Sequence, residues 1–175
     1  MNRSSLVATL LACLGPVWAI TATGSQSLGV NIGAAGKVAV VQSSVTLTRT
    51  GGTFGNYTGS ATLQYKIRTT TSTGSSSITA KASGDFTPTA GPRISNSELT
   101  YTCSGATTGT GCSGTQTVST SSQTSVITVG SGVCTGTGCA GSDPNSVTVN
   151  LTLENDPGYK TGTYSTSLVF TISAL

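Results

Sequence analysis

The chain of 175 residues contains no histidine. Histidine is the side chain that ordinarily exchanges a proton near neutral pH, so its absence excludes the Ser-His-Asp and Cys-His systems of nucleophilic catalysis. The acidic residues are few: Asp85, Glu98, Asp143, Glu154 and Asp156. Asp143 and Asp156 each precede a proline in a turn, where a carboxylate is expected to cap the local backbone. We therefore expect no catalytic residues and no enzymatic activity.

Charged and aromatic residues are also scarce. Charged residues make up 7% of the chain and the formal net charge is +3, too little to steer the protein to nucleic acid or to an anionic membrane. The single tryptophan, Trp18, lies near the amino terminus. Saccharide sites generally use flat aromatic side chains, and only Tyr57 and Tyr159 are expected on turns. Binding of a polysaccharide is therefore kept as an alternative and is not our main expectation.

The amino terminus has the pattern of a secretory signal peptide. Residues 1–3 supply a basic end, residues 4–19 are almost all apolar or small, and Val17 and Ala19 suit a signal peptidase. We expect residues 1–19 to be removed and the protein to be secreted or displayed at the cell surface. A membrane anchor is disfavoured, because about 16 residues fall short of the roughly 20 that span a bilayer. A lipoprotein box ending at Cys13 is the alternative that stays open.

Removal of residues 1–19 leaves four cysteines, an even set that is normally oxidised in an exported chain. They are Cys103, Cys112, Cys134 and Cys139. Neither local pair has the spacing of a typical zinc site or of a Cys-x-x-Cys redox motif, and no histidine completes a metal site. We expect two disulfides, most simply Cys103–Cys112 and Cys134–Cys139, although the two other connectivities remain open. No metal or other cofactor is expected.

Three oxygen-bearing side chains, Glu154, Asn155 and Asp156, follow one another at the end of a predicted strand. Calcium binds oxygen ligands of this kind, but no EF-hand spacing accompanies them. A turn that begins at these residues and continues through Pro157 is the stronger interpretation.

Apolar residues alternate with hydroxylated ones along most of the chain, which is typical of strands with one buried face. Outside the signal peptide no window has the apolar spacing of a helix. The alternating runs centre on residues 28–32, 38–40, 45–47, 63–67, 78–82, 99–103, 147–153 and 164–172. They predict an all-β, immunoglobulin-like β-sandwich of about seven to nine strands. We expect the last two runs to form an antiparallel pair.

The predicted domain comprises residues 37–175, preceded by an amino-terminal arm at residues 20–36. Residues 104–146 are mostly Gly, Ser and Thr and hold three of the four mature cysteines. We interpret them as a disulfide-pinned insertion with one or two extra strands.

The arm carries Leu28, Val30 and Ile32 on one side and Gly29 and Asn31 on the other. A segment with one apolar face must bury it, either in its own sheet or in the groove of a neighbouring molecule by strand addition. Both outcomes remain open. The second would make the arm a strand-exchange element and the protein a polymerising subunit.

The carboxyl end, "NDPGYKTGTYSTSLVFTISA" at residues 155–174, resembles exported bacterial surface proteins of the spore-coat-U and fimbrial-subunit type. The matching positions are Gly162, Tyr164, Leu168, Phe170 and Ile172. The resemblance implies a secreted immunoglobulin-like sandwich that serves as a building block of a coat or pilus-like filament, without catalytic or ligand residues. The chain differs from the fimbrial pattern in lacking an early cysteine pair and an aromatic residue beside the carboxyl terminus.

Together these observations predict a non-catalytic structural protein that self-associates through β-strand contacts as a homo-oligomer or filament. No nucleic acid and no membrane insertion after signal cleavage are expected. A monomeric secreted carbohydrate-binding or adhesin module is the alternative.

Overall fold

The structure is a computed structural model that describes residues 27–69, 74–133 and 144–175. The signal peptide, Cys13, Asp143, Cys134 and Cys139 lie outside these residues, so the expectations for them stay predictions. The chain divides into residues 1–31 and residues 32–175, and the fold below is that of the second part. The all-β prediction is confirmed, because the described residues form ten strands and one three-residue 3-10 helix, η1 (Ile94–Asn96), and no α-helix.

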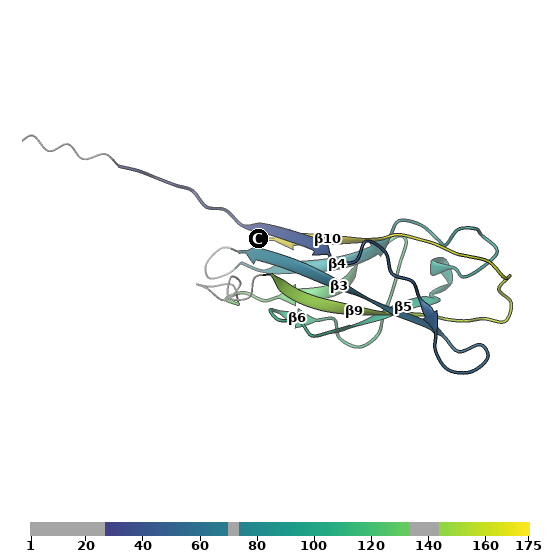
Figure 1. The fold of residues 1–175 in the computed structure, drawn as a ribbon. Helices are drawn as coiled ribbons and strands as arrows, with labels where there is room; N and C mark the ends of the chain where they lie inside the picture. Colours follow the sequence, from purple (N-terminus) through teal and green to yellow (C-terminus); the bar gives the residue numbers. More distant parts are fainter. Residues whose placement is uncertain (1–26, 70–73, 134–143) are drawn as a thin grey trace, which may run out of the picture. The chain divides into compact units, whose positions relative to one another are not determined.

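The strands form two antiparallel sheets (Figure 1). The six-stranded sheet has the order β1 (Ala35–Val40), β3 (Tyr57–Arg68), β9 (Asn145–Leu153), β5 (Leu99–Ser104) and β7 (Gln116–Thr117), and β2 (Thr48–Arg49) also pairs with β3. The four-stranded sheet has the order β10 (Leu168–Ala174), β4 (Ser76–Ala82), β8 (Thr124–Val129) and β6 (Thr110–Gly111). Among the described residues seven strands have six residues or more, and the other three have two residues each. The number of longer strands lies within the predicted seven to nine.

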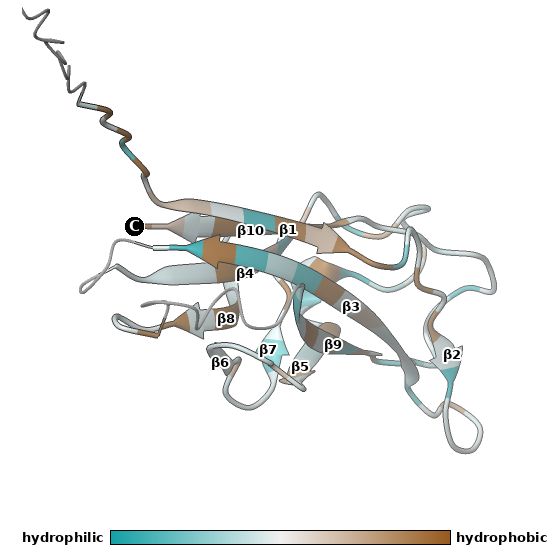
Figure 2. Ribbon diagram, turned by 60° about the vertical axis from the view of Figure 1, so that its left-hand side comes forward, coloured by the Kyte–Doolittle hydropathy of each residue, from teal (hydrophilic) through white to brown (hydrophobic). Residues whose placement is uncertain are grey.

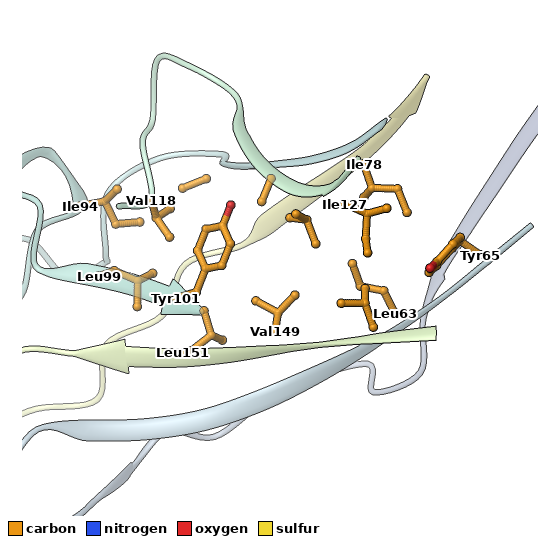
Figure 3. Packing of buried hydrophobic residues seen from close by; sticks show 14 of the residues in the cluster. Leu63, Tyr65, Ile78, Ile94, Leu99, Tyr101, Val118, Ile127, Val149 and Leu151 are labelled. Atoms are coloured by element: carbon orange, nitrogen blue, oxygen red, sulfur yellow. The ribbon is translucent and has the colours of Figure 1, made fainter. Parts of the chain in front are cut away.

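Alternation along the strands places one set of side chains between the sheets. In β9 every second residue from Asn145 to Leu153 is buried, and the residues between them face outward. Figure 2 shows the same alternation of hydrophobic and hydrophilic bands along β3. The buried apolar residues form one cluster (Figure 3) that includes Leu63, Tyr65, Ile78, Tyr101, Val118, Ile127, Val147 and Val149. Burial of this cluster is the main favourable contribution to folding.

The expected pairing of the last two strands is wrong. Strand β9 lies between β3 and β5, whereas β10 pairs with β4 in the other sheet. The connection from residue 154 to residue 167 crosses between the sheets, and an isolated bridge joins Ser165 to Thr87 on its way. The alternation in each run predicts which side chains are buried, but it carries no information about the partner strand.

The stretch predicted as an insertion contributes three strands, β6, β7 and β8, rather than one or two. Strand β8 is an inner strand between β4 and β6, and Val126, Ile127 and Val129 from it are fully buried. The part of residues 104–146 that the structure describes therefore supplies a share of the core itself.

Residues 45–47, predicted as strand, lie just before β2 and outside any strand. Val45 and Leu47 are nevertheless half-buried against the core. They sit over Gly59 of β3, where an added Cβ would lie 2.8 Å from Leu47 Cδ2 and 3.0 Å from Val45 Cγ1. The absence of a side chain at Gly59 lets this segment pack closely on β3.

Candidate strand-exchange site

The predicted exchange arm is an uncovered segment with an apolar alternation. Of its described residues, 27–34 form no strand, whereas 35 and 36, predicted as part of the arm, begin β1. The side chains of Leu28, Val30 and Ile32 are 96%, 82% and 65% exposed. The burial that the alternation predicts is thus not met within the described chain. A continuous run of exposed apolar side chains is unusual for a monomeric protein and marks a candidate contact surface.

The arm leads directly into β1, the outermost strand of the six-stranded sheet. Arg68 Nε donates a hydrogen bond to the carbonyl oxygen of Gly33 at 2.8 Å, which fixes the last residues before β1. Among the described residues β1 pairs with β3 alone, so its other backbone edge is open. An open strand edge presents unpaired N–H and C=O groups that can template another strand.

Strand β10 is the outermost strand of the four-stranded sheet and pairs with β4 alone within the described chain. Leu168, Phe170 and Ile172 face the core but are only half-buried, while Val169 on the other face is 50% exposed. The three positions predicted from the alternation of residues 164–172 therefore do share one face. Within the described chain no further strand is hydrogen-bonded to this edge of β10, and these three side chains stay partly exposed.

Strands β1 and β10 lie side by side, as both ribbon views show (Figures 1 and 2). At Gly36 of β1 an added Cβ would lie 3.0 Å from Cδ1 and Cγ1 of Ile172. We call the outer edges of β1 and β10, with half-buried Val38, Leu168, Phe170 and Ile172, the open edge. Among the described residues, neither strand has a hydrogen-bonded partner on this side, and the edge carries apolar side chains at every second residue. An added strand requires both features.

The opposite side of the sandwich is closed covalently. Cys103 of β5 and Cys112, which follows β6, form a disulfide with Cα atoms 5.3 Å apart, so this predicted pair is confirmed. The bond joins a strand of one sheet to a residue beside a strand of the other. We call this side, which β6 and β7 complete, the closed edge.

The tyrosines proposed for sugar binding are not exposed platforms. Tyr57 is the first residue of β3 and is half-buried against the core, so its expected place on a turn is wrong. Tyr159 is partly buried and its hydroxyl is enclosed without a hydrogen-bond partner. Burial raises the pKa of the Tyr159 hydroxyl, and the carboxylates of Glu98, Glu154 and Asp156 raise it further. Both residues are therefore partly covered by the protein.

The candidate calcium residues serve the local turn. Asp156 Oδ1 accepts a hydrogen bond from the backbone N–H of Gly158 at 2.6 Å, and Asn155 Nδ2 donates to the carbonyl oxygen of Gly55 at 3.0 Å. Within residues 27–69, 74–133 and 144–175, no group of three or more His, Cys, Asp or Glu side chains is placed to hold a metal ion.

Phe54 is the aromatic residue that the analysis of the sequence missed. It is 54% exposed on the connection between β2 and β3. A single phenylalanine among Gly and Thr shows no periodicity, so nothing in the pattern separates it from a core residue.

No family model, curated protein or solved structure matches the chain. In the described part of the chain, no helix has both the length and the apolar character needed to cross a bilayer.

Proposed function

We propose that the chain is a non-catalytic structural subunit of an exported coat or filament. Copies join when the arm of one molecule adds as a strand along the open edge of the next. The observation that supports this most is the presence, in one polypeptide, of an exposed alternating arm and an incompletely covered apolar edge. The resemblance of the carboxyl end to spore-coat-U and fimbrial subunits agrees with this function.

The spacing of the two elements is compatible with strand addition. Leu28, Val30 and Ile32 recur every second residue, as do Leu168, Phe170 and Ile172. In an extended strand such positions lie about 6.6 Å apart on one face, so three arm side chains can contact the apolar strip at once. Each contributes roughly 1.5–3 kcal/mol when it is fully buried. Backbone hydrogen bonds to the unpaired edge would add affinity that is independent of side chains.

A neighbour is a better source of the added strand than the same molecule. Only Gly33 and Ala34 separate Ile32 from the first residue of β1. The hydrogen bond from Arg68 to the Gly33 carbonyl continues the chain along the direction of β1. Folding back onto the open edge would require a tight reversal at these two residues and loss of that bond.

The first experiment adds one charge at adjacent positions of the arm in the full-length exported protein. Val30→Asp places a carboxylate on the apolar side, and Gly29→Asp places the same group on the opposite side. We expect the first variant to abolish filaments in electron micrographs and detergent-resistant ladders on gels, and the second to retain both. Equal behaviour of the two variants, or a wild-type protein that remains monomeric at high concentration, would rule out this mode of assembly.

A second experiment identifies the receiving strand. Copies with Val30→Cys are mixed with copies with Ile172→Cys, and oxidation should give a covalent dimer that is cleaved by reductant. Replacement of Ile172→Cys by Thr171→Cys, which faces outward on the same strand, should give little dimer. Cross-linking to both positions with equal yield would contradict insertion along the inner face of β10.

A further inference from the structure

The connection between β2 and β3, residues 50–56, presents an aromatic ring in a conformation that a bulky residue rarely adopts. Phe54 has a φ angle of 62°, in the left-handed region, and its side chain is 54% exposed. This region favours glycine because a Cβ atom comes close to the backbone there. Figure 1 shows the connection as a dark blue loop that projects beyond β2. The ring gains little from packing and its backbone is strained.

The loop that carries Phe54 is tightly built. The N–H and Oγ1 of Thr50 both donate to the carbonyl oxygen of Asn56, at 2.9 and 3.0 Å, and the N–H of Gly55 donates to Gly52 at 3.0 Å. An added Cβ at Gly55 would lie 1.9 Å from the Thr50 oxygen, so only glycine fits. Asn155 Nδ2 holds the Gly55 carbonyl from the neighbouring turn. These contacts hold the backbone of the loop on both sides of Phe54.

Polar groups that differ in chemistry lie on the loop of Phe54 and on the turn that is hydrogen-bonded to it. Thr53 and Asn56 flank Phe54 on the loop and are exposed, and Glu154 and Asp156 lie on the turn that Asn155 joins to the loop. An exposed aromatic face beside hydroxyl, amide and carboxylate groups is the combination that binds a sugar. The ring contacts the C–H face of a pyranose and the polar groups bind its hydroxyls.

We propose that Phe54 and the adjoining 154–156 turn form a saccharide-binding tip whose ligand is a β-linked pyranose chain with flat C–H faces. A second copy of the protein is the competing occupant, and a loss of self-association in the Phe54 variants would identify it.

The tip is separate from the open edge where the arm enters. Tyr57 and Arg68 are the two ends of β3, about 36 Å apart at roughly 3.3 Å per residue. Phe54 precedes the first of them, and Ala35 of β1 pairs with the second. Saccharide binding therefore does not depend on the proposed assembly, and either function could fail without the other.

The test uses the full-length exported protein with cellotetraose and chitotetraose as probes, titrated by calorimetry or by amide chemical shifts. We expect at least one of the two to bind. Phe54→Ala removes the ring but keeps the backbone conformation, and it should weaken binding at least tenfold. Phe54→Tyr should retain binding, and Val169→Ala, an exposed apolar side chain on β10, should leave it unchanged.

Phe54→Gly separates function from stability. Glycine relieves the left-handed strain, so the variant should lose saccharide binding while its Tm rises by about 2–4 °C. A fall in Tm would show that the ring stabilises the fold and would overturn the proposal. So would binding that persists in Phe54→Ala, absence of binding to either probe, or a loss of self-association in place of saccharide binding.

Discussion

At the closed edge a disulfide and a short continuous stretch of chain join the two sheets, whereas at the open edge only side-chain contacts do. Strand β5 passes through β6 to β7, from one sheet to the other and back, and the Cys103–Cys112 bond spans the crossing. Between β1 and β10 the contact is packing without strand pairing, as where the side chain of Ile172 lies against Gly36. Val126, Ile127 and Val129 of β8, next to the closed edge, are fully buried, whereas Cys103, Cys112 and the apolar side chains of the open edge are half-buried.

This difference separates two requirements that the proposed subunit would have to meet. The closed edge gives one molecule a stable sandwich before it meets any partner. The open edge leaves apolar surface and backbone hydrogen-bonding groups that a neighbour can cover. Stability and assembly are therefore expected to respond to different substitutions.

The sharpest test of this contrast replaces one isoleucine by alanine at each of the two edges. Ile127→Ala, in β8 beside β6, removes a fully buried side chain and should lower the free energy of unfolding by about 3–4 kcal/mol. Ile172→Ala at the open edge should cost only about 1 kcal/mol in the unassembled protein, because its side chain is already partly in water. Chemical denaturation of both variants measures the difference. Equal losses would show that the two edges are equally well packed.

Removal of the covalent link is expected to be the next largest effect. Cys103→Ser with Cys112→Ser opens a ring with a sequence separation of 9 residues and should cost roughly 2–3 kcal/mol through greater freedom of the unfolded chain. Thermal unfolding of the double variant and of the wild-type protein, both without reductant, measures this loss. If the arm acts at the open edge alone, the oxidised and reduced forms should still assemble through it. Loss of assembly on reduction without unfolding would break the proposed division between the edges.

The smallest expected effect concerns Tyr101, which links the sheets by a polar contact. Its hydroxyl donates to the carbonyl oxygen of Ser125 at 2.8 Å, and burial raises the pKa of this hydroxyl above 10.0. The folded state thus prefers the protonated form, so its contribution is complete below pH 10 and is lost as pH rises through the folded pKa.

With no histidine, the free energy of unfolding should be nearly constant from pH 5 to 8 and should fall above about pH 10. Tyr101→Phe should cost about 1 kcal/mol at neutral pH and reduce the alkaline loss. Urea denaturation across this pH range measures both effects. A steep change between pH 5 and 8 would reveal a coupled acid that these contacts do not account for.

Much of the fold follows from local pattern. The alternation of Leu63, Tyr65 and Ile67, or of Val147, Val149 and Leu151, predicts both the strand and its buried face, because side chains in a strand alternate strictly between faces. The partners of each strand are decided by contacts far apart in the chain. That is why β9 and β10, adjacent in the sequence, were assigned to one sheet and lie in two.

The candidate sites likewise divide into features that a local sequence pattern predicts and features that depend on the folded structure. The apolar period of the arm and the nearby cysteines Cys103 and Cys112 are visible in the sequence because each signal lies within about ten residues. The open edge depends on β1 and β10, from opposite ends of the chain, lying together, and no local pattern predicts that. The role proposed for Phe54 depends on its backbone φ angle and on the exposure of its side chain. Neither property is encoded in residue type alone.

The carboxyl terminus has a practical consequence for anyone who labels this protein. Leu175 follows β10, and Ala35 begins β1. The two lie at the same end of the sandwich, because Ala174 pairs with Ser76 at the start of β4 and Ala35 pairs with Arg68 at the end of β3. An affinity tag or fluorescent fusion attached after Leu175 would therefore lie beside the segment that leads into the proposed exchange arm. An insertion after Ser122, in the exposed turn that precedes β8, places the label at the opposite end of the four-stranded sheet, because Thr124 pairs with Ala80 whereas Val129 pairs with Ser76.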